Sequence, residues 1–206
     1  MLLKDVAYEK IKEKILDETY KPGKFLSERT LINALEMSKT PIKNALVRLE
    51  SEGFVTVSSK QGIIVNDLSI DRINDIYNLR IALETFNCEE IYNRITEEDL
   101  LELYRNLQDT RVTSDNLDVK GFAALDHEFH LMISEVAENS EITRILLNYQ
   151  DHLRRITLRH LSREPSRVKK FYKDHVNIYE ALKSNRKDAV QFMRNHLQES
   201  KNMLFK

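Results

Sequence analysis

The sequence has a single cysteine, Cys88, among its 206 residues. One thiol cannot form an internal disulfide, so a disulfide framework is excluded and we expect Cys88 to be a buried bystander. The sequence also has no apolar run near the roughly 18 residues that a membrane-spanning helix needs, and its N-terminus lacks the apolar core of a secretory signal peptide. These absences predict a cytoplasmic protein with no membrane partner.

Glycine and proline are scarce and unevenly placed. The chain has 4 glycines and 3 prolines, and only Gly121 and Pro165 lie beyond residue 62. Because tight turns favour these residues, we expect turns in the first part of the chain and continuous helices in the remainder. We therefore predict a mainly α protein, with a small N-terminal domain over residues 1–66 and an all-α antiparallel helical bundle of about six helices over residues 67–206.

The charge is nearly balanced overall but divides along the chain. Residues 1–65 carry 11 Lys and Arg against 9 Asp and Glu, whereas residues 66–206 carry 21 against 24. A mildly basic head on an acidic body fits a protein that contacts nucleic acid with its head alone.

Residues 38–65 predict a helix, a tight turn and a two-stranded hairpin. Thr40 is expected to cap the helix, and Pro41 suits the first turn, where a missing N–H is no loss. Gly53 is expected to end the helix, and Gly62 to turn the loop between two apolar strands. The helix has one apolar face and one cationic face. The apolar face comprises Ile42, Ala45, Leu46 and Leu49, and the cationic face comprises Lys39, Lys43, Asn44 and Arg48.

Two further helices precede this stretch, over residues 5–17 and 28–35, and Ser27 is expected to cap the second. Two helices, a basic helix and a hairpin with a basic tip follow one another in the order of a winged helix-turn-helix, which presents its third helix to DNA. The alternative is a small domain whose lysines are merely solvated.

From residue 70 onward the apolar spacing is helical throughout. Thr96 and Ser140 are expected to begin helices, since acidic residues follow each of them at the positive end of the helix dipole. Asn185 is expected to end the fifth helix of this part. The predicted helices cover residues 70–94, 96–112, 118–137, 141–161, 166–184 and 186–204.

Three of the six histidines lie on apolar helix faces together with one aspartate. Asp126 and His130 are four residues apart and therefore share a face, whereas His175 and His196 lie on the apolar stripes of two later helices. Burying these side chains without partners is costly, and one divalent metal would satisfy all four. The alternative for each histidine alone is a hydrogen-bonded core residue. The remaining histidines are expected to be core or solvent-facing residues: His127, His152 and His160.

The first domain carries a long series of motif residues. They are Gly23, Leu26, Glu28, Leu31, the run Ser38-Lys39-Thr40-Pro41-Ile42-Lys43-Asn44-Ala45-Leu46, then Leu49-Glu50, Gly53-Phe54-Val55, Gly62 and Val65. In these residues the domain resembles the DNA-binding domain of the GntR family of bacterial transcription regulators. The resemblance implies a non-enzymatic regulator that binds a pseudo-palindromic double-stranded DNA operator as a homodimer.

The resemblance also implies which residues contact DNA. The family's usual arginines are replaced here by Lys39 and Lys43, and its usual glutamate by Asn44. Because arginine contacts guanine bidentately whereas lysine is a point charge, we expect an operator that differs from the family's common one. Arg48 is expected to be a base contact, a phosphate contact or part of a solvated face. The DNA-binding residues implied by position are Arg29, Lys39, Thr40, Lys43 and Gly62. Asn44, which could pair with adenine, and Arg48 are added to them as candidates.

Residues 70–206 resemble the FCD ligand-binding domain of the FadR branch of the same family. Metal-binding members supply an Asp and a His one helical turn apart, followed by one His from each of two later helices. The implied ligands here are Asp126, His130, His175 and His196. Such a set suits zinc or nickel best and also iron or manganese.

An anionic effector beside the metal would need a cation. Arg80 matches a family arginine, and Arg155 and Arg159 are further candidates, although each of the three could simply be salt-bridged. Together these residues predict a repressor whose operator affinity is controlled by a small organic acid bound next to the metal. One alternative is a helical-bundle metalloenzyme, for which the Glu-x-x-His pairs of di-iron bundles and a general base are missing. Another is a regulator whose metal is purely structural.

Overall fold

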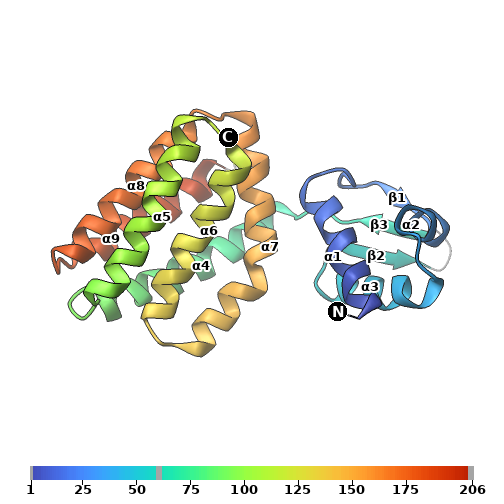
Figure 1. Cartoon of the computed structure of the whole chain (residues 1–206), viewed down its shortest axis with the longest axis horizontal. Coiled ribbons are helices and arrows are strands. Elements are labelled where there is room, and N and C mark those ends of the chain that lie inside the picture. The colour runs from blue at the N-terminus through green and yellow to red at the C-terminus, as the bar shows by residue number, and fades with distance from the viewer. Residues whose placement is uncertain (1, 59–61, 204–206) are drawn as a thin grey trace. The chain divides into compact units, whose positions relative to one another are not determined.

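The computed structural model describes residues 2–58 and 62–203 (Figure 1). The chain divides into two compact units, Met1–Ser69 and Ile70–Lys206. Over the described residues the first unit contains three helices and a small sheet, and the second contains six helices. The predicted fold class, a winged helix-turn-helix followed by an all-helical bundle, is confirmed.

The first unit packs three helices against a three-stranded antiparallel sheet. Its helices are α1 (Leu3–Leu16), α2 (Glu28–Leu35) and α3 (Lys39–Ser51), and its strands are β1 (Phe25–Leu26), β2 (Val55–Ser58) and β3 (Gly62–Val65). β3 lies between the other two, with Ile63 opposite Leu26 on one side and Val57 on the other. The hairpin of β2 and β3 was predicted. β1 was not, because a strand of two residues is too short to show an alternating pattern.

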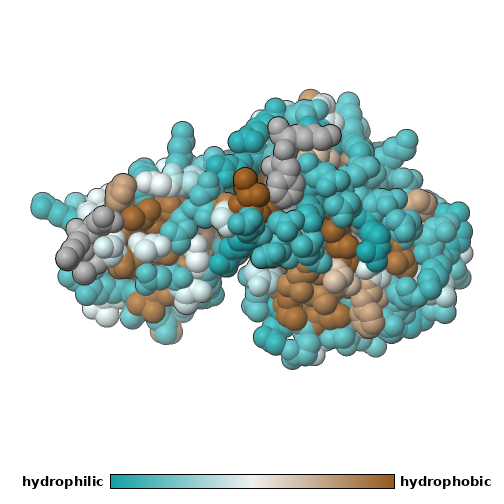
Figure 2. Space-filling view, turned by 180° about the vertical axis from the view of Figure 1, so that it is seen from behind, coloured by the Kyte–Doolittle hydropathy of each residue, from teal (hydrophilic) through white to brown (hydrophobic). Residues whose placement is uncertain are grey.

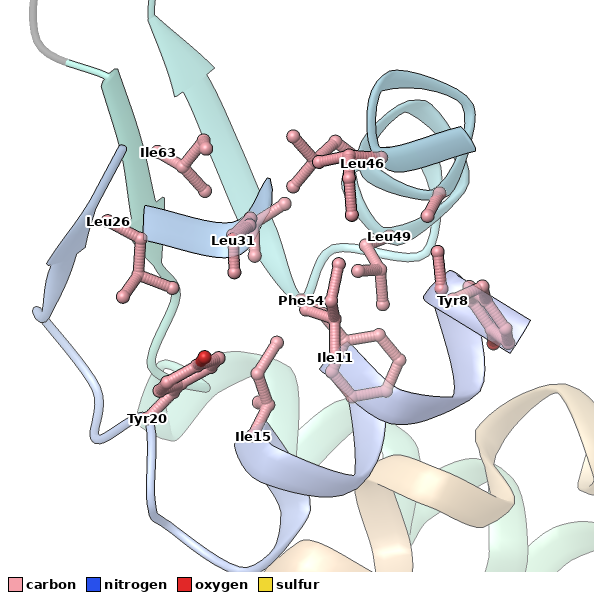
Figure 3. Close-up of a cluster of buried hydrophobic side chains, with 14 of the residues drawn as sticks. Tyr8, Ile11, Ile15, Tyr20, Leu26, Leu31, Leu46, Leu49, Phe54 and Ile63 are labelled. Carbon is pink, nitrogen blue, oxygen red and sulfur yellow. The ribbon is translucent and has the colours of Figure 1, made fainter. Parts of the chain in front are cut away.

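The core of this unit is formed by the inner faces of all three helices and the sheet (Figure 3). Ile11 and Ile15 of α1, Leu31 of α2 and Leu49 of α3 are completely buried there. The rest of the predicted apolar face of α3 is buried with Leu49, whereas the cationic positions on that helix are exposed. Burial of this face therefore fixes which side of α3 remains open to solvent.

The ends of α3 differ from the prediction at one residue. Ser38 precedes the helix in an extended conformation, so helical backbone starts at Lys39 and the predicted cap at Thr40 is wrong. Gly53 lies just beyond the helix with a φ of +85°, which is the left-handed conformation that favours glycine. The predicted end is thus confirmed. Lys60, the basic residue expected at the tip of the hairpin, lies outside the described residues.

The second unit is a helical bundle that agrees with the predicted ranges to within a few residues. α6 packs between α5 and α7, α4 packs along α9, and α8 contacts α5 and α9. Within the described parts of the chain, no helix is long and apolar enough to cross a membrane. The helices are α4 (Ile70–Ile91), α5 (Glu97–Asp115), α6 (Val119–Val136), α7 (Ser140–Arg163), α8 (Arg167–Lys183) and α9 (Asp188–Met203).

Capping residues set the boundaries of these helices. Thr96 and Asp99 form a reciprocal capping box at the start of α5, as the prediction required of Thr96. Asn185 has a φ of 51° just beyond α8, which confirms it as the residue that ends this helix. At α7, however, Asn139 is the cap: its side-chain oxygen accepts a 3.2 Å hydrogen bond from the backbone N–H of Ile142. The helix itself starts at Ser140, as predicted.

The cap of α7 gives a matched pair of substitutions. We expect Asn139→Ala to lower the free energy of unfolding by about 1 kcal/mol, because it removes the acceptor of an otherwise unpaired helix N–H. Ser140→Ala should cost less than about 0.5 kcal/mol, since Ser140 is exposed and lies inside the helix. Urea unfolding followed by circular dichroism measures both, and a larger cost for Ser140→Ala would contradict the assignment.

Candidate functional site

The exposed face of α3 brings together most of the residues expected to contact DNA. Lys39, Thr40, Lys43 and Asn44 are all exposed on this helix, and Arg29 is exposed on α2. Lys39 also makes an ion pair with Glu28, at 3.0 Å between Nζ of the lysine and Oε2 of the glutamate. Because both partners are accessible to solvent, this pair contributes at most about 1 kcal/mol and leaves the ammonium group available to a stronger anion.

A groove of about 560 Å³ separates α3 from the hairpin. Lys43 and Val47 line it from the helix, and Val57 and Gly62 line it from the strands. Gly62 has a φ of +85°, and a Cβ placed on it would come within 3.0 Å of the carbonyl oxygen of Leu26. Glycine is thus favoured at this position both by the backbone conformation and by the neighbouring strand β1.

Arg48, in contrast, contacts α1. The centre of its guanidinium lies 3.7 Å from the centre of the Tyr8 ring, and its Nε donates a 3.0 Å hydrogen bond to Glu52. The hydroxyl of Tyr8 donates to the other oxygen of Glu52 at 2.6 Å. Burial and the Glu52 carboxylate raise the pKa of Tyr8 to about 12. These contacts join α1 to the end of α3, a tertiary arrangement that helical spacing alone does not reveal.

The helical unit contains the second candidate site in its interior. Asp126 and His130 of α6, His175 of α8 and His196 of α9 are all buried, and each offers one ligand atom within 4.8 Å of the others. The Nε2 atoms of His130 and His196 lie 3.3 Å apart, and Nε2 of His175 lies 3.4 Å from Oδ1 of Asp126. Three imidazoles and a carboxylate converging in this way could hold one divalent metal ion.

The environment of His175 fits such an ion. The residue is fully buried, and neither of its ring nitrogens has a hydrogen-bond partner among the residues that the structure describes. Its ring lies flat against Phe129, with 4.3 Å between ring centres. Burial, helped by the nearby His196 and His130, holds the pKa of His175 well below its ordinary value. The imidazole is therefore neutral, which is the form that binds metals, and a metal would satisfy a nitrogen whose isolation costs roughly 1–3 kcal/mol.

Two carboxylates that the sequence did not single out lie behind the cluster. Oε2 of Glu84 is 2.5 Å from Nδ1 of His130, and Oδ2 of Asp174 is 3.4 Å from Nδ1 of His196. Arg80 donates from its Nε to Oε1 of Glu84 at 2.5 Å. Burial alone would raise the pKa of Glu84, but Arg80 and His130 lower it to about 2. The only sequence signal for the ion pair of Arg80 and Glu84 is their spacing of one helical turn on α4.

A small pocket lies beside the cluster and has room for about one water molecule. Arg80, Asp126 and His196 line it on one side. Thr157 and His160 of α7 and Arg167 at the start of α8 also line it. Arg167, which sequence reasoning missed, is the second arginine at this pocket.

The other predicted effector residues and histidines lie elsewhere. Arg155 is buried and Arg159 half-buried on α7, and neither is among the residues that line the pocket. His127 is half-buried with Nε2 at 3.2 Å from Oε1 of Gln150, as expected of a hydrogen-bonded residue. His152 is buried.

Comparison with known proteins identifies the family. The model of the FCD domain matches residues 75–199, and that of the bacterial regulatory proteins, gntR family, matches residues 3–65. The chain belongs to the GntR family of transcription regulators and carries an FCD domain. Members of this family bind DNA operators and are not enzymes, so the metalloenzyme alternative is set aside.

Individual relatives of this GntR regulator extend over most of its length. The HTH-type transcriptional repressor RspR of Escherichia coli K12 is 26% identical over 182 residues, which is 86% of this chain and 78% of RspR. The gluconate operon transcriptional repressor of Bacillus subtilis 168 is 28% identical over 173 residues, 84% of this chain and 69% of the relative. Among solved structures, E. coli McbR/YncC has the same fold, with a TM-score of 0.80, 21% identity and coverage of 100% of this chain and 98% of McbR/YncC.

The interior cluster predicts metal binding that depends on His175. We expect the purified chain to retain one divalent ion per chain after dialysis, measured by elemental analysis, and His175→Phe to retain none. Phenylalanine preserves the stacking on Phe129 but offers no ligand atom. The control is His127→Phe, which makes the same change outside the cluster and should leave the ion in place. Metal retained by a folded His175→Phe variant would contradict the assignment.

Proposed function

We propose that this GntR regulator is a cytoplasmic repressor whose operator affinity is controlled by a small carboxylate bound next to a divalent metal, zinc or nickel, in the FCD domain. The observation that carries the proposal is the convergence of Asp126, His130, His175 and His196 inside a protein that reads DNA. The names of two relatives, both called transcriptional repressors, support the direction of control.

The DNA contacts are assigned to the exposed face of α3 and to the hairpin. Lys39, Lys43 and Asn44 would enter the major groove, where lysine and asparagine side chains can bind base edges and phosphates. Arg29 and Thr40 would contact the backbone beside them, and Gly62 would let the hairpin approach the adjacent groove. Arg48 would reach a phosphate only by leaving Glu52 and Tyr8, so we assign it mainly to the packing of α1 on α3.

We further propose that residues 67–206 dimerise the protein. An operator with two half-sites needs two recognition helices, and α4 carries an accessible apolar stripe at helical spacing: Leu79, Ala82, Leu83 and Phe86. Phe86 alone is 46% exposed. Figure 2 shows hydrophobic side chains gathered on one face of the helical unit. Sedimentation of the purified chain measures its mass, and a monomer at the concentration that binds operator would contradict the dimer.

The effector is assigned to the pocket that Arg80 shares with the cluster. Arg80 and Arg167 supply positive charge there, whereas Arg155 and Arg159 would act on the ligand only through a rearrangement of α7. Because the pocket admits about one water molecule, a carboxylate of several atoms has to displace part of the wall. The carboxylate would therefore bind better to an arrangement of the helices with a wider pocket than to the present one. Such a difference in affinity between two arrangements is what an effector needs in order to shift the affinity for DNA. The gluconate operon named for one relative is consistent with an organic acid as the signal.

The DNA-binding assignment is tested by Lys39→Ala/Lys43→Ala. Removing two cations from the recognition face should weaken operator binding at fixed salt at least ten-fold and reduce the salt dependence of the affinity by about one unit per lost phosphate contact. Gel shift at several salt concentrations measures both. The matched control is Lys169→Ala/Lys173→Ala, which removes two exposed lysines from α8. If the two double variants bind alike, α3 is not the recognition helix.

The remaining alternative is a metal that only stabilises the fold. Removing the metal distinguishes this alternative from a metal that takes part in effector binding. If the ion and the carboxylate share a site, chelation should abolish the thermal stabilisation that a screen of small carboxylates gives to the metal-loaded protein. If the ion is only structural, chelation should lower the melting temperature while carboxylate binding to the folded apoprotein persists. Differential scanning fluorimetry with and without chelator measures both quantities.

A further inference from the structure

In two of the three clustered histidines, the ring nitrogen that faces away from the centre of the cluster lies beside a carboxylate, which we call a backing carboxylate. Glu84 approaches Nδ1 of His130, and Asp174 approaches Nδ1 of His196. The Nε2 atoms of the same two rings face each other at 3.3 Å. The carboxylates thus lie on the far side of the rings from the point where the ligand atoms meet.

This placement determines which nitrogen is left for a metal. A neutral imidazole carries one proton, and an ionised carboxylate can only accept a hydrogen bond. A carboxylate beside Nδ1 therefore keeps the proton on that atom and leaves the lone pair of Nε2 directed at the centre. The same contact fixes the rotation of the ring, which a metal ligand needs in order to hold its distance.

Glu84 has a second donor to satisfy. Its Oε1 accepts from Nε of Arg80 while its Oε2 faces His130, and both Glu84 and Arg80 are at most 5% exposed. The carboxylate thus accepts a hydrogen bond from Arg80 with one oxygen and lies against the His130 ring with the other. A buried carboxylate is retained only when a cation and hydrogen bonds offset its desolvation, and Arg80 supplies both. An amide of the same shape has one oxygen and cannot serve the two donors at once.

We propose that Glu84 is a positioning residue of the metal centre and that Arg80 holds it in place; the inference rests on the proposed function to the extent that an ion occupies the cluster. Asp174 has the same role toward His196, with a smaller contribution because its side chain is 23% exposed and its contact is 3.4 Å long. Arg80 would therefore hold Glu84 in place even when no effector is bound. An effector carboxylate bound at Arg80 would change the contact of Arg80 with Glu84, and through it the contact of Glu84 with His130. The affinities for the metal and for the effector would therefore be coupled reciprocally.

The test measures Zn²⁺ affinity by competition with a chromophoric chelator for the wild-type chain, Glu84→Gln and Glu90→Gln. Glu90 lies on the same helix but is exposed, so its variant controls for the loss of one charge from α4. We expect Glu84→Gln to bind Zn²⁺ about 10–100-fold more weakly and Glu90→Gln to bind as the wild type does. NMR of the Zn²⁺-loaded protein gives a signature that a merely structural role would not affect: a slowly exchanging imidazole Nδ1–H resonance in the wild type and in Glu90→Gln, absent from Glu84→Gln.

Equal affinity and an unchanged Nδ1–H resonance in Glu84→Gln would overturn the inference while leaving the metal centre intact. A wild-type chain that does not bind Zn²⁺ would instead overturn the metal centre itself. If circular dichroism shows that Glu84→Gln does not fold, Asp174→Asn takes its place. Asp174 is only partly buried, so its substitution disturbs the core less than that of Glu84. A Zn²⁺ affinity of Asp174→Asn equal to that of the wild type would then refute the role of the backing carboxylates.

Discussion

The arrangement of the helical unit depends on how it compensates four polar side chains that are buried together. Burying three imidazoles and a carboxylate without partners is unfavourable, since each unsatisfied polar group costs roughly 1–3 kcal/mol. The structure solves part of this with neighbouring carboxylates and part with aromatic stacking, and it leaves the ring nitrogens of His175 to be satisfied by something else. The convergence of four ligand atoms within 4.8 Å of one another is what distinguishes this cluster from an ordinary set of core histidines.

The two units differ in how directly their function follows from local sequence. In the first unit the proposed recognition surface is the solvent side of one amphipathic helix, so the residues that are buried also determine the residues that are exposed. Lys39 and Lys43 are exposed because Ile42 and Leu46 are buried between and beside them. In the second unit the cluster draws on α6, α8 and α9, and only the fold of the whole bundle brings these helices together.

The limits of prediction follow from the same difference. The helices and their apolar faces were predictable because they depend on periodicity over many residues, and Asp126 with His130 could be paired because one turn separates them. The convergence with His175 and His196 required the family resemblance. The cap of α3, predicted at Thr40, was misplaced by two residues, since several neighbouring polar side chains could each have served and local backbone geometry decides among them.

Partners across helices were the features that could not be predicted. Glu84 lies on the first helix of the bundle and meets His130 only after folding, and Asp174 adjoins a predicted ligand yet backs a different one. Arg48 had the spacing of a DNA contact, but its position over Tyr8 depends on how α1 crosses α3. Each of these contacts joins residues that are distant in the chain, so no periodic signal precedes it.

Only some of the helices that line the small pocket also supply a side chain to the cluster. The four clustered side chains belong to α6, α8 and α9, whereas Thr157 and His160 come from α7, which supplies none of the four. An ion at the cluster would join α6, α8 and α9, and it would leave α4 and α7 as the two pocket walls that supply no ligand. The three joined helices would then be fixed relative to one another, and a guest larger than the pocket would be accommodated by displacement of α4 or α7.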